Sequence, residues 1–378
     1  MDILSILHLP ATTIITYAIP FLVALTLIVF VHEYGHFKIA RLCGVKVDTF
    51  AIGFGRELWG RNDRHGTRWK IGWLPLGGYV KFAGDANAAS LPQAASSDHP
   101  PRAGDFPTKP LWQRALVVAA GPVANFLLAI AIFAASYALI GLPASEPRVD
   151  GVIVGGAADK AGIKSGDFIR AINGARIDRF QDIQDIVTTH AGESLSILLD
   201  RNGAAITIVA VPEAIEQSDG FGGKIRLGRL GIQNNGSSLI YDKKSVGESL
   251  RLGVDRTWFI VETTFRYLGK LFLGQESPNQ LGGFISIAKA AGDAASVGIA
   301  QFIFVVGLLS VSIGLINLFP IPMLDGGHLV YYAIEAIRGK PLGPEAQEWG
   351  FKIGFTVVLT LMLVGTWNDL MRLVAPVQ

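Results

Sequence analysis

Four long apolar segments limit the folds open to this chain more than any other feature. Each is about as long as the roughly 20 mostly apolar residues that a helix needs to cross the hydrocarbon core of a bilayer. The segments lie near residues 12–40, 111–140, 297–319 and 351–371. The sequence therefore predicts a polytopic α-helical membrane protein with four transmembrane helices.

The composition indicates that parts of the chain lie outside the membrane. Of the 378 residues, 50% are hydrophobic and 17% are charged, which is more charge than a chain made of spans alone would carry. The formal net charge is only +2, so the composition gives no reason to expect nucleic acid as a partner. The single cysteine, Cys43, excludes an internal disulfide and a Cys-rich metal site.

The first apolar segment is interpreted as a retained span and not as a cleaved signal peptide. The residues before it include Asp2 and no Lys or Arg, so the basic start of a signal peptide is missing. The segment also leads directly into a polar motif at residues 32–36, which cleavage would detach from the membrane.

The distribution of Lys and Arg predicts how the spans are oriented. Basic residues are concentrated in the connection at 41–110 and in the short connection at 331–352. Because such loops stay in the cytoplasm, both connections are expected on that side. Both termini and the long connection at 142–296 are then expected on the outer side of the membrane.

Residues 42–110 are predicted to form a β region that dips into the cytoplasmic side of the membrane, followed by a linker. Gly, Trp, Phe, Tyr and Val dominate residues 45–82, with turn signals at 61–63 and 76–78. A membrane-reentrant hairpin is tolerated only where protein or a wet cavity covers its backbone. Residues 86–110, rich in Ala, Ser, Pro and Asp, are typical of a linker.

Residues 142–233 have the pattern of a soluble α/β module. Strands are predicted near 149–154, 195–199 and 204–211, and a helix at 180–189. Residues 151–174, with the AGIKSGD turn and the start of the INGARI hairpin, resemble the PDZ family. PDZ domains bind extended peptides as an added strand. The resemblance therefore implies an extended peptide or a substrate ectodomain as partner, the alternative being a PDZ-like fold that only packs or blocks.

Residues 234–296 are expected to contain an amphipathic helix at the periplasmic membrane surface, in contact with lipid. Apolar residues recur at helical spacing over 246–272, while Arg251, Asp255, Glu262 and Arg266 occupy the other positions. A helix that docks a protein partner is the alternative.

The motif His32-Glu33-Tyr34-Gly35-His36 fits the pattern HExxH. Residues four apart share one face of a helix, so both imidazoles can bind one Zn²⁺. Glu33 is then placed to act as the general base of a hydrolase. Ionisable groups at the end of a span are costly and indicate function, although a buried polar cluster without metal is the alternative.

A catalytic zinc site needs a third protein ligand. Asp325 is the candidate, because the first and third spans run in the same direction and each motif lies at the inner end of its span. It stands in the sequence Asn317-Leu-Phe-Pro320-Ile-Pro322-Met-Leu-Asp325-Gly, and His328 is a rival ligand.

HExxH in the first span, N-x-x-P-x-P-x-x-D-G in the third and a PDZ module between them together resemble the site-2 protease family. The resemblance extends to residues 75–85, 121–126 and 285–292. It implies an intramembrane zinc metalloprotease in which His32, His36 and Asp325 bind zinc and Glu33 is catalytic. It further implies that substrate is positioned by Asn317, Pro320 and Pro322 and by a hairpin containing Gly77, Gly78, Tyr79 and Val80.

In that family the substrates are single-span membrane proteins, such as a truncated anti-sigma factor, and remnant signal peptides, cut in regulated intramembrane proteolysis at the bacterial inner membrane. Well-known members carry two PDZ modules, whereas this chain has room for one. A membrane-anchored PDZ scaffold without protease activity and a zinc protease of soluble peptides are the alternatives. The chain is expected to divide into the first span with HExxH (1–41), the β region and linker (42–110), the second span (111–141) and the PDZ module (142–233). The region of the amphipathic helix (234–296), the third span with the Asp motif (297–330), and the last connection with the fourth span (331–378) follow.

Overall fold

The structure is a computed structural model that describes residues 11–84, 102–218, 224–235, 239–274 and 282–374. The chain folds into two compact units. One unit combines Met1–Ser136 with Val246–Gln378, and the other is Tyr137–Ser245. The second unit is therefore inserted between two halves of the first.

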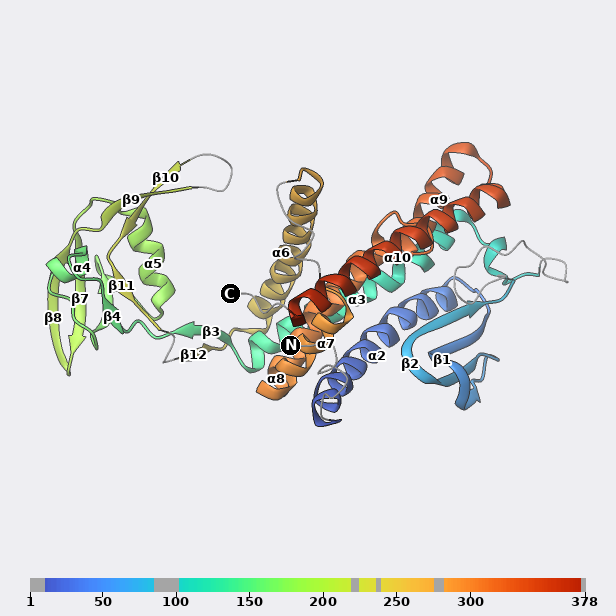
Figure 1. Ribbon diagram of the computed structural model, residues 1–378, viewed down its shortest axis with the longest axis horizontal. Coiled ribbons are helices and arrows are strands. Elements are labelled where there is room, and N and C mark those ends of the chain that lie inside the picture. Colours follow the sequence, from blue (N-terminus) through green and yellow to red (C-terminus); the bar gives the residue numbers. More distant parts are fainter. Residues whose placement is uncertain (1–10, 85–101, 219–223, 236–238, 275–281, 375–378) are drawn as a thin grey trace. The chain divides into compact units, whose positions relative to one another are not determined.

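Within the described ranges, four helices of the first unit are long and apolar enough to cross a membrane (Figure 1). Apolar side chains such as Val23, Leu127 and Leu363 are more than half exposed, as expected where lipid replaces water as the solvent. The helices lie where the sequence predicted spans, and their length and apolar composition fit an integral membrane protein. They are α2 (Ala11–Leu42), α3 (Leu111–Leu139), α8 (Ile299–Leu318) and α10 (Pro344–Val374).

Three further helices of this unit are α6 (Val246–Phe272), α7 (Phe284–Val297) and α9 (Asp325–Arg338). In α6 the side chain of Trp258 is exposed while that of Ile260 is buried, which agrees with the predicted amphipathic helix. The start of α7 is held by α10, because the Asp369 carboxylate accepts hydrogen bonds from the backbone N–H groups of Gly283 (3.1 Å) and Ile285 (3.0 Å).

The β region consists of β1 (Val47–Asn62) and β2 (Arg68–Phe82), paired antiparallel. The start of β1 is paired on both sides, since Phe50 is opposite both Val80 and Trp69. The end of β2 consequently forms an edge of this small sheet. The turn predicted at 76–78 is wrong, because these residues lie within β2, where the chain changes its pairing and Gly77 has a φ of 149°.

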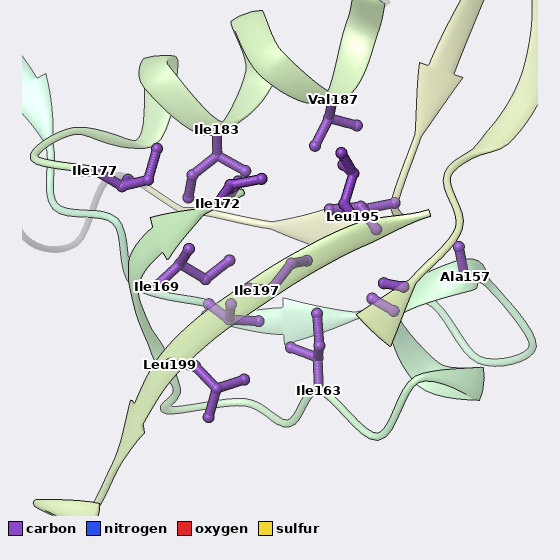
Figure 2. Close-up of a cluster of buried hydrophobic side chains, with 14 residues drawn as sticks. Ala157, Ile163, Ile169, Ile172, Ile177, Ile183, Val187, Leu195, Ile197 and Leu199 are labelled. Carbon is purple, nitrogen blue, oxygen red and sulfur yellow. The ribbon is translucent and has the colours of Figure 1, made fainter. Parts of the chain in front are cut away.

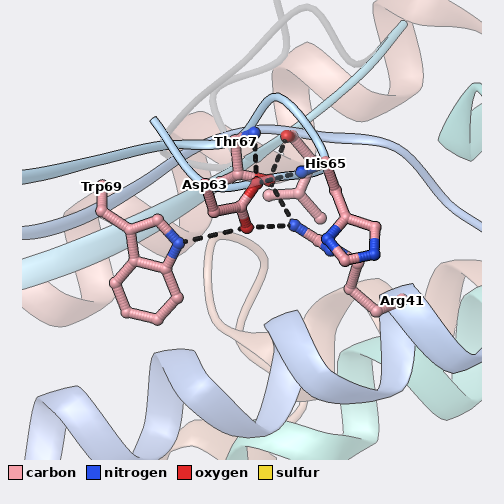
Figure 3. Close-up of polar contacts among 6 residues, drawn as sticks. Arg41, Asp63, His65, Thr67 and Trp69 are labelled. Carbon is pink, nitrogen blue, oxygen red and sulfur yellow. Dashed lines mark hydrogen bonds and ion pairs between the residues drawn. The ribbon is translucent and has the colours of Figure 1, made fainter. Parts of the chain in front are cut away.

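An ion pair fastens this hairpin to the end of α2 (Figure 3). The Arg41 guanidinium donates hydrogen bonds to the Asp63 carboxylate (2.5 Å) and to the Thr67 hydroxyl (2.7 Å). That hydroxyl, which is fully buried, donates in turn to the carbonyl of Val47 at 2.7 Å. The hairpin is thereby anchored to the helix that carries HExxH.

The segment expected to be a linker is only partly described, because its residues 86–101 lie outside the described ranges. Residues 102–110 pack against the hairpin and do not form a linker. Phe106, in a short 3₁₀ helix (Phe106–Thr108), is buried and stacks on Phe82 with ring centroids 4.9 Å apart.

The second unit is built on a four-stranded sheet in the order β6-β5-β7-β8, with helix α5 (Phe180–Thr189) beside it. Its core is formed by branched aliphatic side chains from both, including Ile169, Ile183 and Ile197 (Figure 2). The alternating burial of β7 explains this core, since every second residue points inward. The sheet strands are β5 (Phe168–Ile172), β6 (Ala175–Arg176), β7 (Leu195–Arg201) and β8 (Ala204–Ala210).

Short antiparallel pairs complete the second unit and set its limits. The pair β3–β12 extends the unit beyond residue 233 to Ser245, because Leu142 lies opposite Asp242. The remaining elements are β3 (Leu142–Ser145), β4 (Gly151–Val152), α4 (Ala157–Lys160), β9 (Glu213–Ser218), β10 (Lys224–Arg229), β11 (Ile232–Gln233) and β12 (Leu239–Asp242).

The anchor of the hairpin is expected to depend on pH. Partial burial acts to raise the pKa of Asp63, but hydrogen bonds from the backbones of Thr67 and His65 and from Arg41 outweigh it and hold that pKa below 3.8. The stabilisation is therefore complete above the ordinary carboxyl pKa and is lost as pH falls through the lower folded value. We expect hydrogen-exchange protection factors at residues 63–67 to decrease in that acidic range.

The matched variant is Asp63→Asn, which cannot titrate. It should show reduced protection at neutral pH and no further loss on acidification. Acid-induced loss of the same size in both proteins would contradict the assignment to Asp63.

Candidate metal centre

Two histidines and one aspartate converge inside the first unit. His32 and His36 lie one helical turn apart on α2, both buried, with their Nε2 atoms 3.1 Å apart. The Oδ2 atom of Asp325 lies 3.1 Å from Nε2 of His32 and 3.4 Å from Nε2 of His36. These three residues can offer ligand atoms that all lie within 4.8 Å of one another.

The loop between α8 and α9 positions Asp325 beside the two histidines. Pro320 and Pro322 follow the end of α8 and cannot continue it. Met323 has a φ of 101°, a conformation that a residue other than glycine adopts only under constraint. The turn is tight, because a Cβ on Gly326 would lie 2.2 Å from a carbonyl oxygen at the end of α8. Asp325 thus begins α9 on a firmly shaped loop.

Helix α3 closes the site from the other side. A Cβ on Gly121 would lie 2.2 Å from Nε2 of His36 and 2.8 Å from Nε2 of His32, so only glycine keeps the space beside both ligand atoms open. The Nδ1 atom of His36 lies 2.9 Å from the carbonyl oxygen of Val117. The Nδ1 atom of His32 lies 3.2 Å from the amide of Asn125. Both imidazoles are therefore oriented by α3.

The residues present fit a zinc ion. Two imidazoles and a carboxylate form a donor set used in catalytic zinc sites, which keep a fourth position open. Oδ2 of Asp325 is buried beside both imidazoles, yet has no hydrogen-bond partner within the described ranges. An ionised carboxylate and neutral imidazoles are the forms of these side chains that bind zinc.

Glu33 lies between the metal ligands and the edge of β2. A Cβ on Gly78 would lie 3.2 Å from Cγ of Glu33 and 3.1 Å from Cγ1 of Val29, so the strand runs directly over α2. The backbone of Val80 hydrogen-bonds to the Glu33 carboxylate. The predicted hairpin residues 77–80 are thus brought to the predicted catalytic residue. Within this strand the ring of Tyr79 stacks on that of Phe54, with centroids 6.3 Å apart.

Other predicted residues lie nearby without joining the group of three. Asn317 donates its amide to the carbonyl of Ile313 in its own helix (2.9 Å). Pro322 packs against α10, where a Cβ on Gly354 would collide with its carbonyl oxygen. The rival ligand His328 lies one turn after Asp325 and is outside the group, although its buried Nε2 has no hydrogen-bond partner in the part of the chain that the structure describes.

Sequence reasoning missed the contribution of α3. Asn125 is fully buried in an apolar span, and such a polar residue is a signal of function that could have singled it out. The carbonyl of Val117 has no signature in the sequence. A further contact ties α3 to the ligand helix α9, because Arg114 forms two hydrogen bonds with Glu335, at 2.5 and 3.3 Å.

A buried His-His-Asp group beside a glutamate, carried by helices that span a membrane, defines a membrane-embedded metalloprotease. The chain belongs to Peptidase family M50, whose model matches residues 20–361. It is 44% identical to a zinc metalloprotease of Agrobacterium fabrum, over 95% of this chain and 96% of that protein. It is 38% identical to the metalloprotease MmpA of Caulobacter vibrioides, over 93% and 94% of the two chains.

A zinc metalloprotease of Vibrio cholerae is 30% identical over 96% of this chain and 100% of that protein. That alignment extends over 466 positions against the 378 residues of this chain, so the relative contains segments that this chain lacks. These comparisons confirm the resemblance to site-2 proteases, the metalloprotease activity and zinc as the cofactor.

Substituting the third ligand should weaken zinc binding. Asp325→Asn removes the negative charge and leaves a poor ligand, so we expect the zinc dissociation constant to rise by more than the roughly 10–100-fold that loss of an outer-shell partner causes. The measurement is zinc content after equilibration of purified protein with a graded series of chelator concentrations. The matched variant His328→Asn should retain zinc like the native protein. Zinc loss in His328→Asn alone would transfer the ligand role to that residue.

Proposed function

We propose that this protein is an intramembrane protease of the site-2 type, which hydrolyses peptide bonds within transmembrane segments of other proteins. One observation carries the proposal: Glu33 and two of the three metal ligands, His32 and His36, lie on a membrane-length helix, directly beneath the edge of a β-strand. A protease of soluble peptides has no need for that setting.

The strand edge supports a way to present the substrate. A transmembrane helix hides its carbonyl groups in internal hydrogen bonds, so it must unwind before it is cut. Among the described residues, the segment 78–82 pairs only with β1. Its other edge can therefore accept an unwound substrate as an added strand. Because Gly78 lies against Glu33, the added strand would hold a peptide bond next to the catalytic residue.

Each protein group then has a defined task in hydrolysis. His32, His36 and Asp325 would hold a zinc ion, which supplies Lewis acidity at the attacking water and the scissile carbonyl. Glu33 accepts a proton from the attacking water and passes it to the leaving amine. The hydrogen bond with the backbone of Val80 keeps the Glu33 carboxylate aimed between the ligand group and the strand edge.

The substrates we propose are single-span membrane proteins, such as a truncated anti-sigma factor, and remnant signal peptides, in regulated intramembrane proteolysis. The support is the family, the lipid-facing helices and the strand edge. The basic residues of 41–110 favour a site near the cytoplasmic side of the bacterial inner membrane, with both termini in the periplasm. Lipid would then contact the exposed apolar residues of α6 on the periplasmic surface.

The second unit is proposed to act as a periplasmic PDZ domain that binds an extended peptide or a substrate ectodomain. A groove of about 600 Å³ lies between α5 and residues 228–232. Apolar side chains of Phe180, Ile183 and Val187 contribute to its lining, together with polar groups such as Thr188. A groove beside a helix, lined by apolar and polar side chains, suits binding of a peptide.

A membrane-anchored PDZ scaffold without protease activity is the second hypothesis. A scaffold would have no use for three metal ligands whose burial costs free energy. The retention of His32, His36, Asp325 and Glu33 in one place therefore favours the protease.

The substitution Glu33→Gln tests the proposed function directly. It keeps the shape of the side chain but removes the general base, so cleavage of a transmembrane model substrate should fall by at least the roughly 10²–10⁴-fold attributed to acid–base catalysis. Zinc content should stay unchanged. The surface variant Glu57→Gln is the control and should cleave like the native protein. Native activity in Glu33→Gln would refute the assignment, and absent activity in the native protein would favour the scaffold.

Removing the second unit distinguishes a filter from a recruiting module. Because β3 and β12 form a paired ribbon, residues 147–237 can be replaced by a short turn while the ribbon is kept. A filter predicts that substrates with intact ectodomains are now cleaved as fast as truncated ones. A recruiting module predicts slower cleavage of both. Equal rates before and after removal would contradict both roles.

A further inference from the structure

The two ligand histidines are oriented by partners of different chemical character. Nδ1 of His36 lies 2.9 Å from the carbonyl oxygen of Val117, and a carbonyl oxygen can only accept a hydrogen bond. His36 therefore carries its proton on Nδ1 and presents the lone pair of Nε2 to the metal position. Nδ1 of His32 instead faces the side-chain amide of Asn125 at 3.2 Å. An amide has a donor end and an acceptor end, so this partner does not by itself decide where the proton of His32 lies.

Asn125 is enclosed on every side by the first unit. The side chain of Asn125 is fully buried. A Cβ added to Gly314 of α8 would lie 3.1 Å from the Cβ of Asn125. The hydroxyl of Ser310, also on α8, donates a hydrogen bond to the backbone carbonyl of Asn125 at 2.9 Å. The place of the amide is thus fixed by packing between α3 and α8, while its Oδ1 has no hydrogen-bond partner among the residues that the structure describes.

The structure places Nδ2 of Asn125 nearer to the imidazole than Oδ1. The two ends of an amide are nearly identical in shape, and a half-turn about the last side-chain bond exchanges them without moving other atoms. A histidine that ligates zinc through Nε2 carries its proton on Nδ1 and donates it to an acceptor. Of the two ends of the Asn125 amide, Oδ1 is the one that can accept this hydrogen bond.

We propose that Asn125 is a positioning residue that turns Oδ1 toward His32, accepts the Nδ1–H hydrogen bond and so leaves Nε2 as a zinc ligand. Helix α3 then orients both imidazoles in the same way, with the backbone carbonyl of Val117 acting on His36 and the side-chain carbonyl of Asn125 acting on His32. The inference rests on the zinc site and is independent of the proposed substrate.

Two variants of similar size separate the proposed role from its alternatives. Asn125→Leu keeps the branched shape but removes the hydrogen bond, so the zinc dissociation constant should rise by about 10–100-fold, as when other outer-shell partners are removed. Asn125→Asp offers only acceptor oxygens, so it should bind zinc at least as tightly as the native protein. Zinc affinity is measured by competition with a chelator on the full chain in detergent.

Each other outcome overturns the proposal. If Asn125→Asp loses as much affinity as Asn125→Leu, the amide acts as a donor. If Asn125→Leu binds zinc like the native protein, Asn125 only fills space. Ser312→Ala, which removes a hydroxyl on α8 that bonds only to the carbonyl of Leu308 among the described contacts, is the control and should retain native affinity.

A second measurement covers the case in which a variant does not fold. In zinc-loaded native protein labelled with ¹⁵N-histidine, the chemical shifts of His32 should show a protonated Nδ1, and an unprotonated Nδ1 overturns the proposal. Glu33→Gln is expected to abolish cleavage but to keep zinc bound. Zinc affinity therefore tests this inference separately from the proposed protease activity.

Discussion

The close approach of α2 and α3 is the contact on which the site depends. Ionisable groups within a membrane-spanning bundle cost several kcal/mol unless they are partnered or bind metal. Helix α3 supplies those partners, and it reaches the imidazoles because Gly121 carries no side chain toward them. The two imidazoles can therefore be buried only because α3 brings hydrogen-bond acceptors and the space beside Gly121 to their depth in the membrane. Neither helix alone can satisfy the two histidines.

The third ligand depends on a longer series of contacts. Asp325 stands at the start of α9, immediately after the constrained residue Met323. The far side of α9 is tied to the start of α3 through Arg114 and Glu335. Helix α3 thus orients the two histidines directly, and its Arg114 holds α9, the helix that begins with Asp325, by an ion pair. Small shifts of α3 would disturb all three ligands together, since such sites tolerate little misplacement.

The sequence was sufficient for the features that local pattern controls. Span length located the four membrane helices, and helical spacing placed His32 and His36 on one face. It failed where pairing partners are distant in the chain. Residues 76–78 resemble a turn locally but lie within β2, because the start of β1 pairs with both ends of β2. The second unit extends beyond residue 233, because β12 pairs with β3. The role of Val117 could not be foreseen, because any residue supplies a carbonyl.

The hold of Asp369 on the start of α7 has a consequence for biosynthesis. Helix α7 packs closely on α2, since a Cβ on Gly292 would collide with Tyr17, yet its first N–H groups are bonded by a residue of the last span. The ribosome makes Asp369 after α2 and α7 have been synthesised. The start of α7 therefore gains these hydrogen bonds only once α10 has also entered the membrane, so packing around α2 is completed late in synthesis.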